Sequence, residues 1–341
     1  MKRNREFNRV FQAFGKRRIA SGFFGKSPGT ILLFLLMTPY LVTFLFGNLR
    51  EGGWDRADGE SPHGTGESRF VVSNQTAFGS ESIPLEAYVA DKLARSMDDG
   101  CEMEALKAQA VLIRSGLVAS LYDPDGDVRG SRIGIQDTDY GSVPAGESVR
   151  EAVSQTSGIC LTFEGRPVNG AYFAVSNGST RNGAELFLEE YPYLKSVPCS
   201  RDFLSEDFMS MTNLKESEFN RIWQELAKIR KPQEELIPKE QDRVQESSLG
   251  ITLYRDSAGY VLYLQREGEW ASGEQFRESF HLSSSCFGIG GEDGEIVITV
   301  KGVGHGLGMS QFAAREMAAR GMDYVEILDY FFEDVTFTKF E

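Results

Sequence analysis

The stretch EIVITVKGVGHGLGMSQFAAREMAAR, residues 295–320, joins a strand pattern to a helix pattern through a loop with four glycines. Alternating apolar residues predict a strand over Glu295–Val300, and a helix is predicted over Met309–Arg320, where Gly321 ends it. Along the preceding 200 or so residues, helices and hairpins follow one another without the regular strand–helix repeat of a parallel sheet. The predicted fold class is therefore α+β.

Two helices and two hairpins are predicted upstream of this stretch. The first helix has its apolar face at Leu85, Tyr88, Val89 and Leu93. The second begins near Glu104, ends near residues 123–126, and stacks Leu106, Ala110, Ile113 and Leu117. The hairpins are expected over residues 158–173 and 251–265. The highly charged residues 214–248 are predicted to be a mostly helical, solvated insertion.

An uncharged apolar run near the N-terminus predicts a membrane anchor. Residues 30–47 read TILLFLLMTPYLVTFLFG, which is long enough to cross the hydrocarbon layer as one helix. Residues 1–27 carry eight Lys or Arg against one Glu, so this end is expected in the cytoplasm. The predicted organisation is a basic tail over 1–27, a single transmembrane helix over 28–48, a flexible linker over 49–78 and an extracytoplasmic domain over 79–341. A buried core helix and a cleaved signal peptide are the alternatives for the apolar run.

Charge and residue usage argue against several classes of function. The chain has 36 Lys+Arg against 50 Asp+Glu and a net charge of −14, which argues against a nucleic-acid partner. The four cysteines and three histidines form no recognisable zinc motif, so no metal or cofactor is expected. Two alternatives stand for the cysteines, namely disulfide pairing, for example of Cys199 with Cys286, or burial as small apolar side chains.

The glycine-rich loop over residues 302–308 is a candidate binding loop. A dinucleotide site is excluded because only 33 residues follow Gly308, and the GK[ST] of a phosphate-binding loop is absent. Glycines allow a loop to approach a substrate closely, with His305 at its centre. Because the neighbours of His305 are glycines, we expect little bulk to bury it. A purely structural histidine is the alternative.

A second candidate is the hydroxyl-rich stretch AYFAVSNGST, residues 171–180. Its Ser, Thr and Asn side chains are suited to hydrogen-bonding sugar hydroxyls or N-acetyl groups. An ordinary turn is the alternative. A serine nucleophile is not expected, because no GxSxG elbow is present.

Three segments taken together resemble one family. Leu85-Glu86-Ala-Tyr88-Val89, Glu104-Ala-Leu-Lys107-Ala-Gln109-Ala and the GHGLGMSQ segment over residues 304–311 resemble the stage II sporulation protein D / amidase enhancer LytB family (SpoIID/LytB). The resemblance covers about residues 80–338. It implies a cell-wall protein acting on peptidoglycan: sporulation members are lytic transglycosylases that cut glycan strands stripped of stem peptides. They work beside an amidase, stage II sporulation protein P, and other members enhance an amidase.

The two candidate loops and this resemblance predict one set of substrate-binding residues. The set is Ser176, Asn177, Thr180, Gly304, His305, Gly306, Ser310 and Gln311.

The match breaks at the position of the family's catalytic acid. That Glu precedes Met-Pro, eight residues before the Glu of the EALKAQA helix, and counting back from Glu104 leads to Ser96. A lytic transglycosylase needs a carboxyl group that protonates the leaving oxygen and then accepts a proton from the 6-hydroxyl of the sugar. Serine cannot do this, and the candidates to replace it are Asp98 and Asp99, with Glu102 further along.

Three hypotheses follow from this departure. The first is a membrane-anchored protein that binds denuded glycan and assists an amidase such as a stage II sporulation protein P-like partner, with weak or no cleavage. The second is an active lytic transglycosylase that uses a nearby Asp. The third is a structural sporulation scaffold without catalysis.

Overall fold

The described part of the chain is residues 70–340 of the computed structural model, apart from 77–78, 123–127, 129, 188–190, 227 and 293. The predicted tail over 1–27, the transmembrane helix over 28–48 and most of the linker over 49–78 lie outside the described residues. Within the described ranges, no helix is both long and apolar enough to cross a membrane. Residues Glu67–Glu341 make up one compact unit, which is described here by itself.

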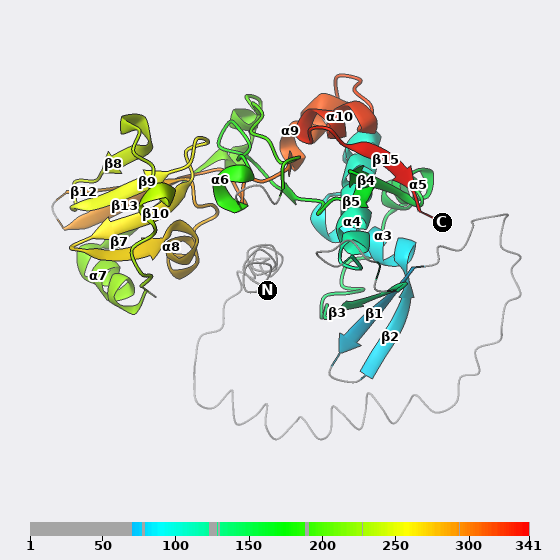
Figure 1. Cartoon of the computed structure of the whole chain (residues 1–341), viewed down its shortest axis with the longest axis horizontal. Helices are drawn as coiled ribbons and strands as arrows, with labels where there is room; N and C mark the ends of the chain where they lie inside the picture. Colours follow the sequence, from blue (N-terminus) through cyan, green and yellow to red (C-terminus); the bar gives the residue numbers. More distant parts are fainter. Residues whose placement is uncertain are drawn as a thin grey trace, which may run out of the picture. The chain divides into compact units, whose positions relative to one another are not determined.

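The described residues form two large hydrophobic cores, and the first surrounds helix α4 (Met103–Ala119). Helix α4 contacts α3 (Leu85–Ser96), α5 (Glu147–Gln155), α9 (Gln311–Ala318) and α10 (Tyr324–Phe331), as Figure 1 shows. Twelve of its seventeen residues are buried, because neighbours cover it on nearly all sides. The predicted apolar face of α3 is confirmed, since Leu85, Tyr88, Val89 and Leu93 are all buried.

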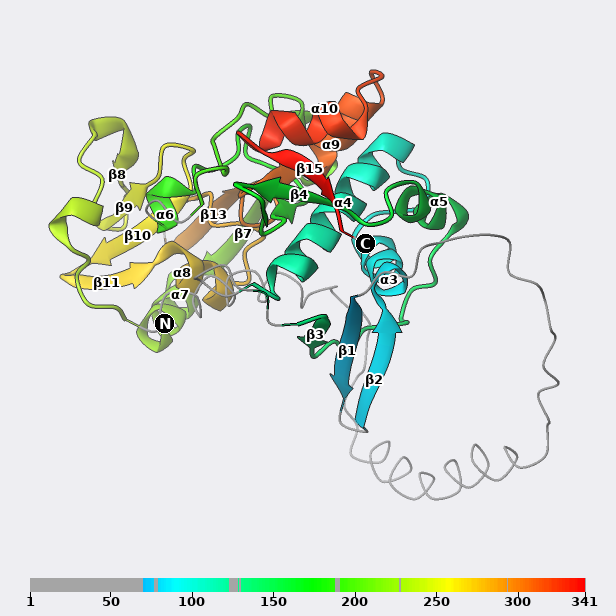
Figure 2. The ribbon, with the colours of Figure 1, turned by 45° about the vertical axis from the view of Figure 1, so that its right-hand side comes forward.

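Two small sheets accompany this helical core (Figure 2). Strands β1 (Val71–Thr76), β2 (Gly79–Pro84) and β3 (Arg132–Ile135) are ordered β2-β1-β3. Strands β4 (Ile159–Phe163), β5 (Arg166–Pro167) and β15 (Thr336–Lys339) are ordered β15-β4-β5, with both pairings antiparallel. Strand β4 contacts α4, so the C-terminal strand of the chain completes a sheet beside the helix predicted from EALKAQA.

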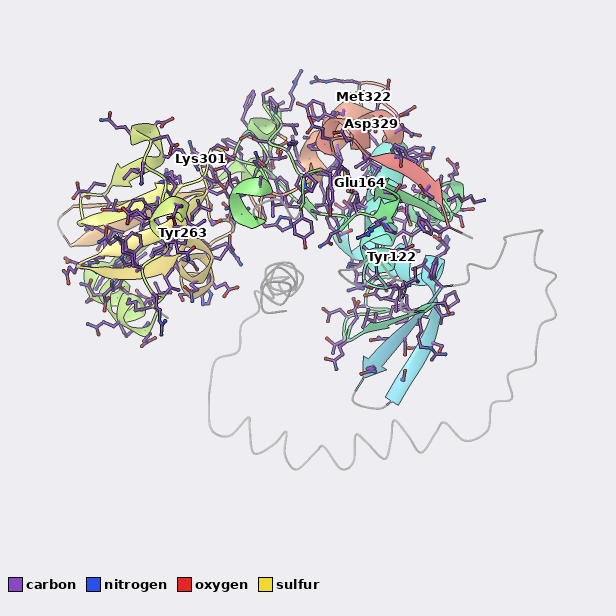
Figure 3. All side chains as sticks on the ribbon, viewed as in Figure 1. Tyr122, Glu164, Tyr263, Lys301, Met322 and Asp329 are labelled. Atoms are coloured by element: carbon purple, nitrogen blue, oxygen red, sulfur yellow. The ribbon has the colours of Figure 1, made fainter. Side chains whose placement is uncertain are left out.

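The second core lies between two antiparallel sheets and two helices. One sheet has β7 (Met209–Lys215), β12 (Phe287–Glu292) and β13 (Glu295–Lys301) in the order β12-β13-β7. The other has β8 (Val244–Glu246), β9 (Ile251–Arg255), β10 (Val261–Arg266) and β11 (Glu269–Ser272) in the order β11-β10-β9-β8. Helices α7 (Glu216–Glu225) and α8 (Gly273–Ser279) contribute Phe219, Trp223 and Phe276 to this core. Figure 3 labels Tyr263 and Lys301 in these sheets, and Glu164 and Asp329 near the helical core.

The chain passes between the two cores through irregular segments with little regular structure. Strand β6 (Tyr172–Phe173) pairs in parallel with β14 (Met309–Ser310), and α6 (Ala184–Phe187) follows. Short 3₁₀ turns occupy Asp202–Leu204 and Glu206–Phe208 before β7, and two more, Glu234–Leu236 and Gln241–Arg243, lie between α7 and β8.

The predicted α+β class is confirmed, and two local predictions are corrected. The hairpin predicted over 158–173 closes with β5 at Pro167, and the residues beyond it run past α4 instead. A Cβ on Gly170 would lie 1.9 Å from the Leu112 carbonyl oxygen, so the chain there packs directly on the helix. The charged stretch 214–248 is helical only over α7, and its Phe219 and Trp223 belong to the second core, so they are not solvated.

Candidate functional site

The C-terminus of α3 meets the N-terminus of α9 at Ser96. The Oγ of Ser96 donates to the Leu93 carbonyl at 3.0 Å, as serine often does at the end of a helix. The Gln311 amide donates to the Ser96 carbonyl at 3.3 Å and to Gln109 Oε1 at 3.2 Å. Three segments that are far apart in the sequence therefore meet at one junction, which we call the Ser96–Gln109–Gln311 junction.

The relative position of α3 and α4 at this junction depends on a buried ion pair. Arg114 of α4 is fully buried, and its guanidinium donates to both oxygens of Glu86, at 2.8 and 2.6 Å. It also donates to the Ile159 carbonyl of β4 at 3.0 Å. A buried guanidinium needs such a bidentate partner because its charge cannot be left unpaired.

The expectation that His305 is uncovered is wrong. Its side chain is 2% exposed and its ring lies 5.7 Å from that of Phe173. The Nδ1 atom accepts a hydrogen bond from the Leu307 N–H at 3.1 Å, and the ring also bonds the Tyr172 backbone. Burial and the nearby Arg181 charge lower the pKa of His305 to about 3, so the imidazole is neutral and serves as a fixed internal hydrogen-bonding group.

The glycines around His305 explain why this expectation fails. A Cβ on Gly304 would lie 2.6 Å from the Phe173 Cβ, and one on Gly306 would lie 2.5 Å from Cζ of Tyr260. On Gly308 it would lie 2.2 Å from the carbonyl oxygen of residue 171. All three glycines have positive φ. The missing side chains admit bulky neighbours from elsewhere in the fold, and these neighbours bury the histidine.

Arg181 fixes the same loop from its other side, and sequence reasoning did not find it. Its backbone N–H donates to the Gly306 carbonyl at 2.7 Å, and its Nη1 donates to the His305 carbonyl at 3.2 Å. Its Nε donates to Asp256 at 2.5 Å, and the guanidinium stacks over Tyr260. An arginine that directly follows the hydroxyl-rich stretch carries no pattern that distinguishes it from a surface arginine.

The predicted sugar-binding hydroxyls are directed inward. Ser176 and Thr180 are fully buried. Thr180 Oγ1 donates to the Lys195 carbonyl at 3.0 Å and accepts from the Val197 N–H at 2.9 Å. The Asn177 amide is half-buried and donates to the Ala258 carbonyl at 2.6 Å. These side chains hold the irregular segments together, and their predicted contact with substrate stays a prediction.

A buried carboxylate that the sequence did not reveal organises the start of α9. Asp202 is fully buried, and its Oδ2 accepts from the Ser176 N–H at 2.6 Å and from the Ser310 Oγ at 2.7 Å. Ser310 in turn caps α9 by accepting from the Ala313 N–H at 3.3 Å. Burial raises the pKa of Asp202, and its Oδ1 has no hydrogen-bond partner among the described residues. Through Ser310, Asp202 sets the direction in which Gln311 leaves the loop.

The candidates to replace the expected acid, Asp98, Asp99 and Glu102, are exposed or bonded to residues other than Ser96. Asp98 is exposed, and Asp99 Oδ1 accepts from the Val149 N–H at 2.9 Å, which caps the first turn of α5. Glu102 forms an ion pair with Arg315 at 3.3 Å. Hydrogen bonds link Ser96 to a backbone carbonyl and to an amide, and neither partner is an acid.

The partly exposed side chains near the junction are those that a ligand can reach. Lys92 is half-buried and lies one helical turn before Ser96 on the same face of α3. Burial, together with the charge of Arg95, lowers the pKa of Lys92. Tyr172 is also half-buried, and burial raises its pKa to about 12. With Gln311, these residues offer an amine, a phenol and an amide. The four cysteines are free and buried.

Part of the described chain matches a known protein family. The family model described as "SpoIID: Stage II sporulation protein" matches residues 73–163, which contain α3, Ser96 and α4. The chain carries a SpoIID domain. The resemblance predicted from the motifs is confirmed.

Similarity to curated proteins extends well beyond the SpoIID domain. Stage II sporulation protein D of Bacillus amyloliquefaciens is 28% identical over 276 residues, 76% of this chain and 75% of that protein. The protein of the same name in Bacillus subtilis (strain 168) is 27% identical, covering 77% and 76%. The amidase enhancer of Bacillus subtilis (strain 168) is 21% identical over 73% of this chain and 40% of that protein.

Proposed function

We propose that this protein acts on the cell wall in sporulation by binding denuded peptidoglycan glycan strands and assisting a cell-wall amidase, with weak or no cleavage of its own. The observation that carries the proposal is Ser96 at the place of the expected acid, bonded to a carbonyl and an amide and to no carboxylate. The family match and the similarity to stage II sporulation protein D support the cell-wall role. The similarity to an amidase enhancer supports the amidase partner.

The chemistry at position 96 supports binding over cleavage. Loss of a general acid lowers a rate by about 10²–10⁴-fold. Asp99 would have to abandon its cap on α5, and Glu102 its ion pair with Arg315, before either carboxyl could serve. Asp98 is exposed, and an exposed carboxyl group lacks the apolar surroundings in which a carboxylic acid acts as a proton donor near neutrality.

Lys92 supports denuded strands as the ligand. A glycan strand that has lost its stem peptides keeps a free carboxylate on each stripped sugar. A half-buried lysine attracts such a group more strongly than a fully solvated one, because screening by water is weaker there. Tyr172 and Gln311 would complete the contact with ring faces and amide groups of the sugars.

We further propose that the apolar run over 28–48 anchors the protein as a single-pass membrane protein with its N-terminus in the cytoplasm. The support is the length of the run and the basic residues that precede it. The domain over 79–341 would then face the cell wall.

Cleavage is tested by incubating the purified protein with amidase-stripped glycan strands and measuring anhydro-muropeptides by mass spectrometry. We expect little product from the unaltered protein and more from Ser96→Glu, which restores a carboxyl group at the end of α3. Abundant product from the unaltered protein, abolished by Asp98→Asn or Asp99→Asn, would replace the proposal with an active lytic transglycosylase.

Binding is tested by sedimentation with insoluble denuded peptidoglycan. We expect Lys92→Met to lower the bound fraction and Lys195→Met, which removes an exposed lysine, to leave it unchanged. If the unaltered protein does not bind, the hypothesis that remains is a structural sporulation scaffold without catalysis.

A further inference from the structure

Strand β7 forms an open edge of its sheet. It lies next to β13 in the order β12-β13-β7, and at seven residues it exceeds the other edge strands of the described sheets, which span two to six. Natural edge strands are usually protected by charge, proline or a bulge, because their free backbone groups invite pairing. Residues Met209–Asn213 read MSMTN, without charge or proline, and their register with β13 is unbroken. The edge of β7 lacks the usual protection.

The outward-facing backbone groups of β7 follow from its pairing with β13. The Gly302 N–H donates to the Phe208 carbonyl at 2.8 Å, and the Glu216 N–H donates to the Gly294 carbonyl at 3.0 Å. Residues of an antiparallel strand bond alternately to one side and to the other. The even-numbered residues of β7 therefore bond to β13, and the N–H and C=O groups of its odd-numbered residues point away from the sheet.

Six of the seven residues of β7 are exposed, on both faces of the sheet, and Leu214 is buried in the second core. Met211 is 65% exposed, Met209 is 46% exposed, and the neighbouring Val297 of β13 is 36% exposed. Ser210 and Thr212, which point to the opposite face, are also exposed. No part of the described chain covers this edge, and exposed methionines are costly unless a partner buries them.

The sequence of β7 is complementary to itself. When two copies of the strand run antiparallel with their centres at Met211, Ser210 of each copy faces Thr212 of the other. Met209 faces Asn213, and Lys215 lies next to the 3₁₀ turn that precedes Met209 of the other copy and carries Asp207; Lys215 and Asp207 are both exposed in this structure. Each end of such a pair thus places opposite charges together, while its middle is neutral. A neutral middle favours the strand pair, because two copies of a chain with net charge −14 repel each other elsewhere.

We propose that β7 pairs with β7 of a second copy of this chain, antiparallel and centred on Met211, to form a homodimer with one continuous sheet. The odd-numbered residues would supply about six interchain backbone hydrogen bonds, two for each facing pair. The methionines of both copies would be buried against one another on the face that carries Val297. This symmetric edge pairing is independent of the proposed glycan function.

Cysteine cross-linking in the full-length protein tests the register. In the proposed pairing the two Met211 Cα atoms are about 5.5 Å apart, which a disulfide spans. The two Met209 Cα atoms are about 14 Å apart, which it does not. Mild oxidation should convert Met211→Cys to a covalent dimer and leave the matched control Met209→Cys at least tenfold less cross-linked. Equal cross-linking of both variants, or of neither, overturns the proposal.

Charge exchange tests the ends of the strand pair, with mass measured by analytical ultracentrifugation. The unaltered protein should double its mass with rising concentration. Lys215→Glu should weaken the dimer at least tenfold, because it places two acids together, and adding Asp207→Lys in the same chain should restore it. A monomer at all concentrations, or a dimer that Lys215→Glu leaves unchanged, would show that this edge does not join two copies.

Discussion

The neutral, buried His305 predicts a specific loss of stability in acid. Its pKa in the folded protein is about 3, against an ordinary value of 6.5. Because the folded value is lowered, the unfolded chain binds the extra proton below pH 6.5, so stability falls as pH falls from 6.5 towards 3. At pH 5 the unfolded imidazole is almost fully protonated and the folded one is neutral. At about 1.4 kcal/mol per pH unit, this difference costs about 2 kcal/mol.

The assay is urea unfolding at pH 7 and pH 5 of the unaltered protein and of His305→Asn. Asparagine keeps an acceptor near the position of Nδ1, which bonds the Leu307 N–H, and it does not titrate. We expect the fall in unfolding free energy between the two pH values to be about 2 kcal/mol smaller in the variant. For a domain of this size that corresponds to roughly 4–8 °C in Tm.

Comparing the loss of unfolding free energy between pH 7 and pH 5 separates the effect of His305 titration from the effect of its packing. His305→Asn also loses ring contacts with Phe173, which lowers stability at both pH values and cancels in the difference. The matched control is His281→Asn, which removes an exposed imidazole. If the unaltered protein and His305→Asn lose the same stability between pH 7 and pH 5, His305 is not a neutral buried group and the account of the loop is wrong.

Three further predictions concern stability. Asp202 has a raised pKa, so its contribution to stability is lost as pH rises above about 4; Asp202→Asn should remove that loss, measured as the change in Tm between pH 4 and pH 7. Gly308→Ala, with a Cβ 2.2 Å from a carbonyl oxygen, should cost at least about 3 kcal/mol in urea unfolding. Its control Gly250→Ala, also at positive φ but in open space, should cost about 1 kcal/mol. Glu86→Gln leaves buried Arg114 without its counter-ion and should cost about 3 kcal/mol, and equal stability of variant and parent would contradict the buried pair.

The local elements of the helical core were predictable because their signals lie close together in the sequence. The apolar spacing of α3 and the start of α4 near Glu104 depend on residues three or four positions apart. The strand, loop and helix of residues 295–320 were predicted within two residues at most boundaries. The prediction that Ser96 stands where the family has its catalytic acid also came from the sequence, by counting eight residues back from Glu104 along the family resemblance.

Strand β7 and helix α7 of the second core were predicted less well than its β9–β10 hairpin and β13, because their sequence pattern is weak. Strand β7 has only Met209 and Met211 as alternating apolar residues, and its conformation depends on pairing with β13, some 80 residues later. Helix α7 reads as a charged surface helix, yet Phe219 and Trp223 are core residues. A few large aromatic side chains can place one face of a highly charged helix in the core, because a neighbouring sheet buries their large apolar area.

The sequence alone determined the α+β class, the two helices of the SpoIID domain and the family resemblance, because each depends on neighbouring positions or on a short motif. Through that resemblance it also predicts that Ser96 replaces a catalytic acid. Only the tertiary structure decided that the glycines around His305 admit Phe173 and Tyr260 and thereby bury it. It also brought Asp202 to Ser310, 108 positions away, to direct Gln311 towards Ser96. A glycine looks the same in the sequence whether the space beside it is filled by a ligand or by the protein's own side chains. Only the packing of distant segments decides between them.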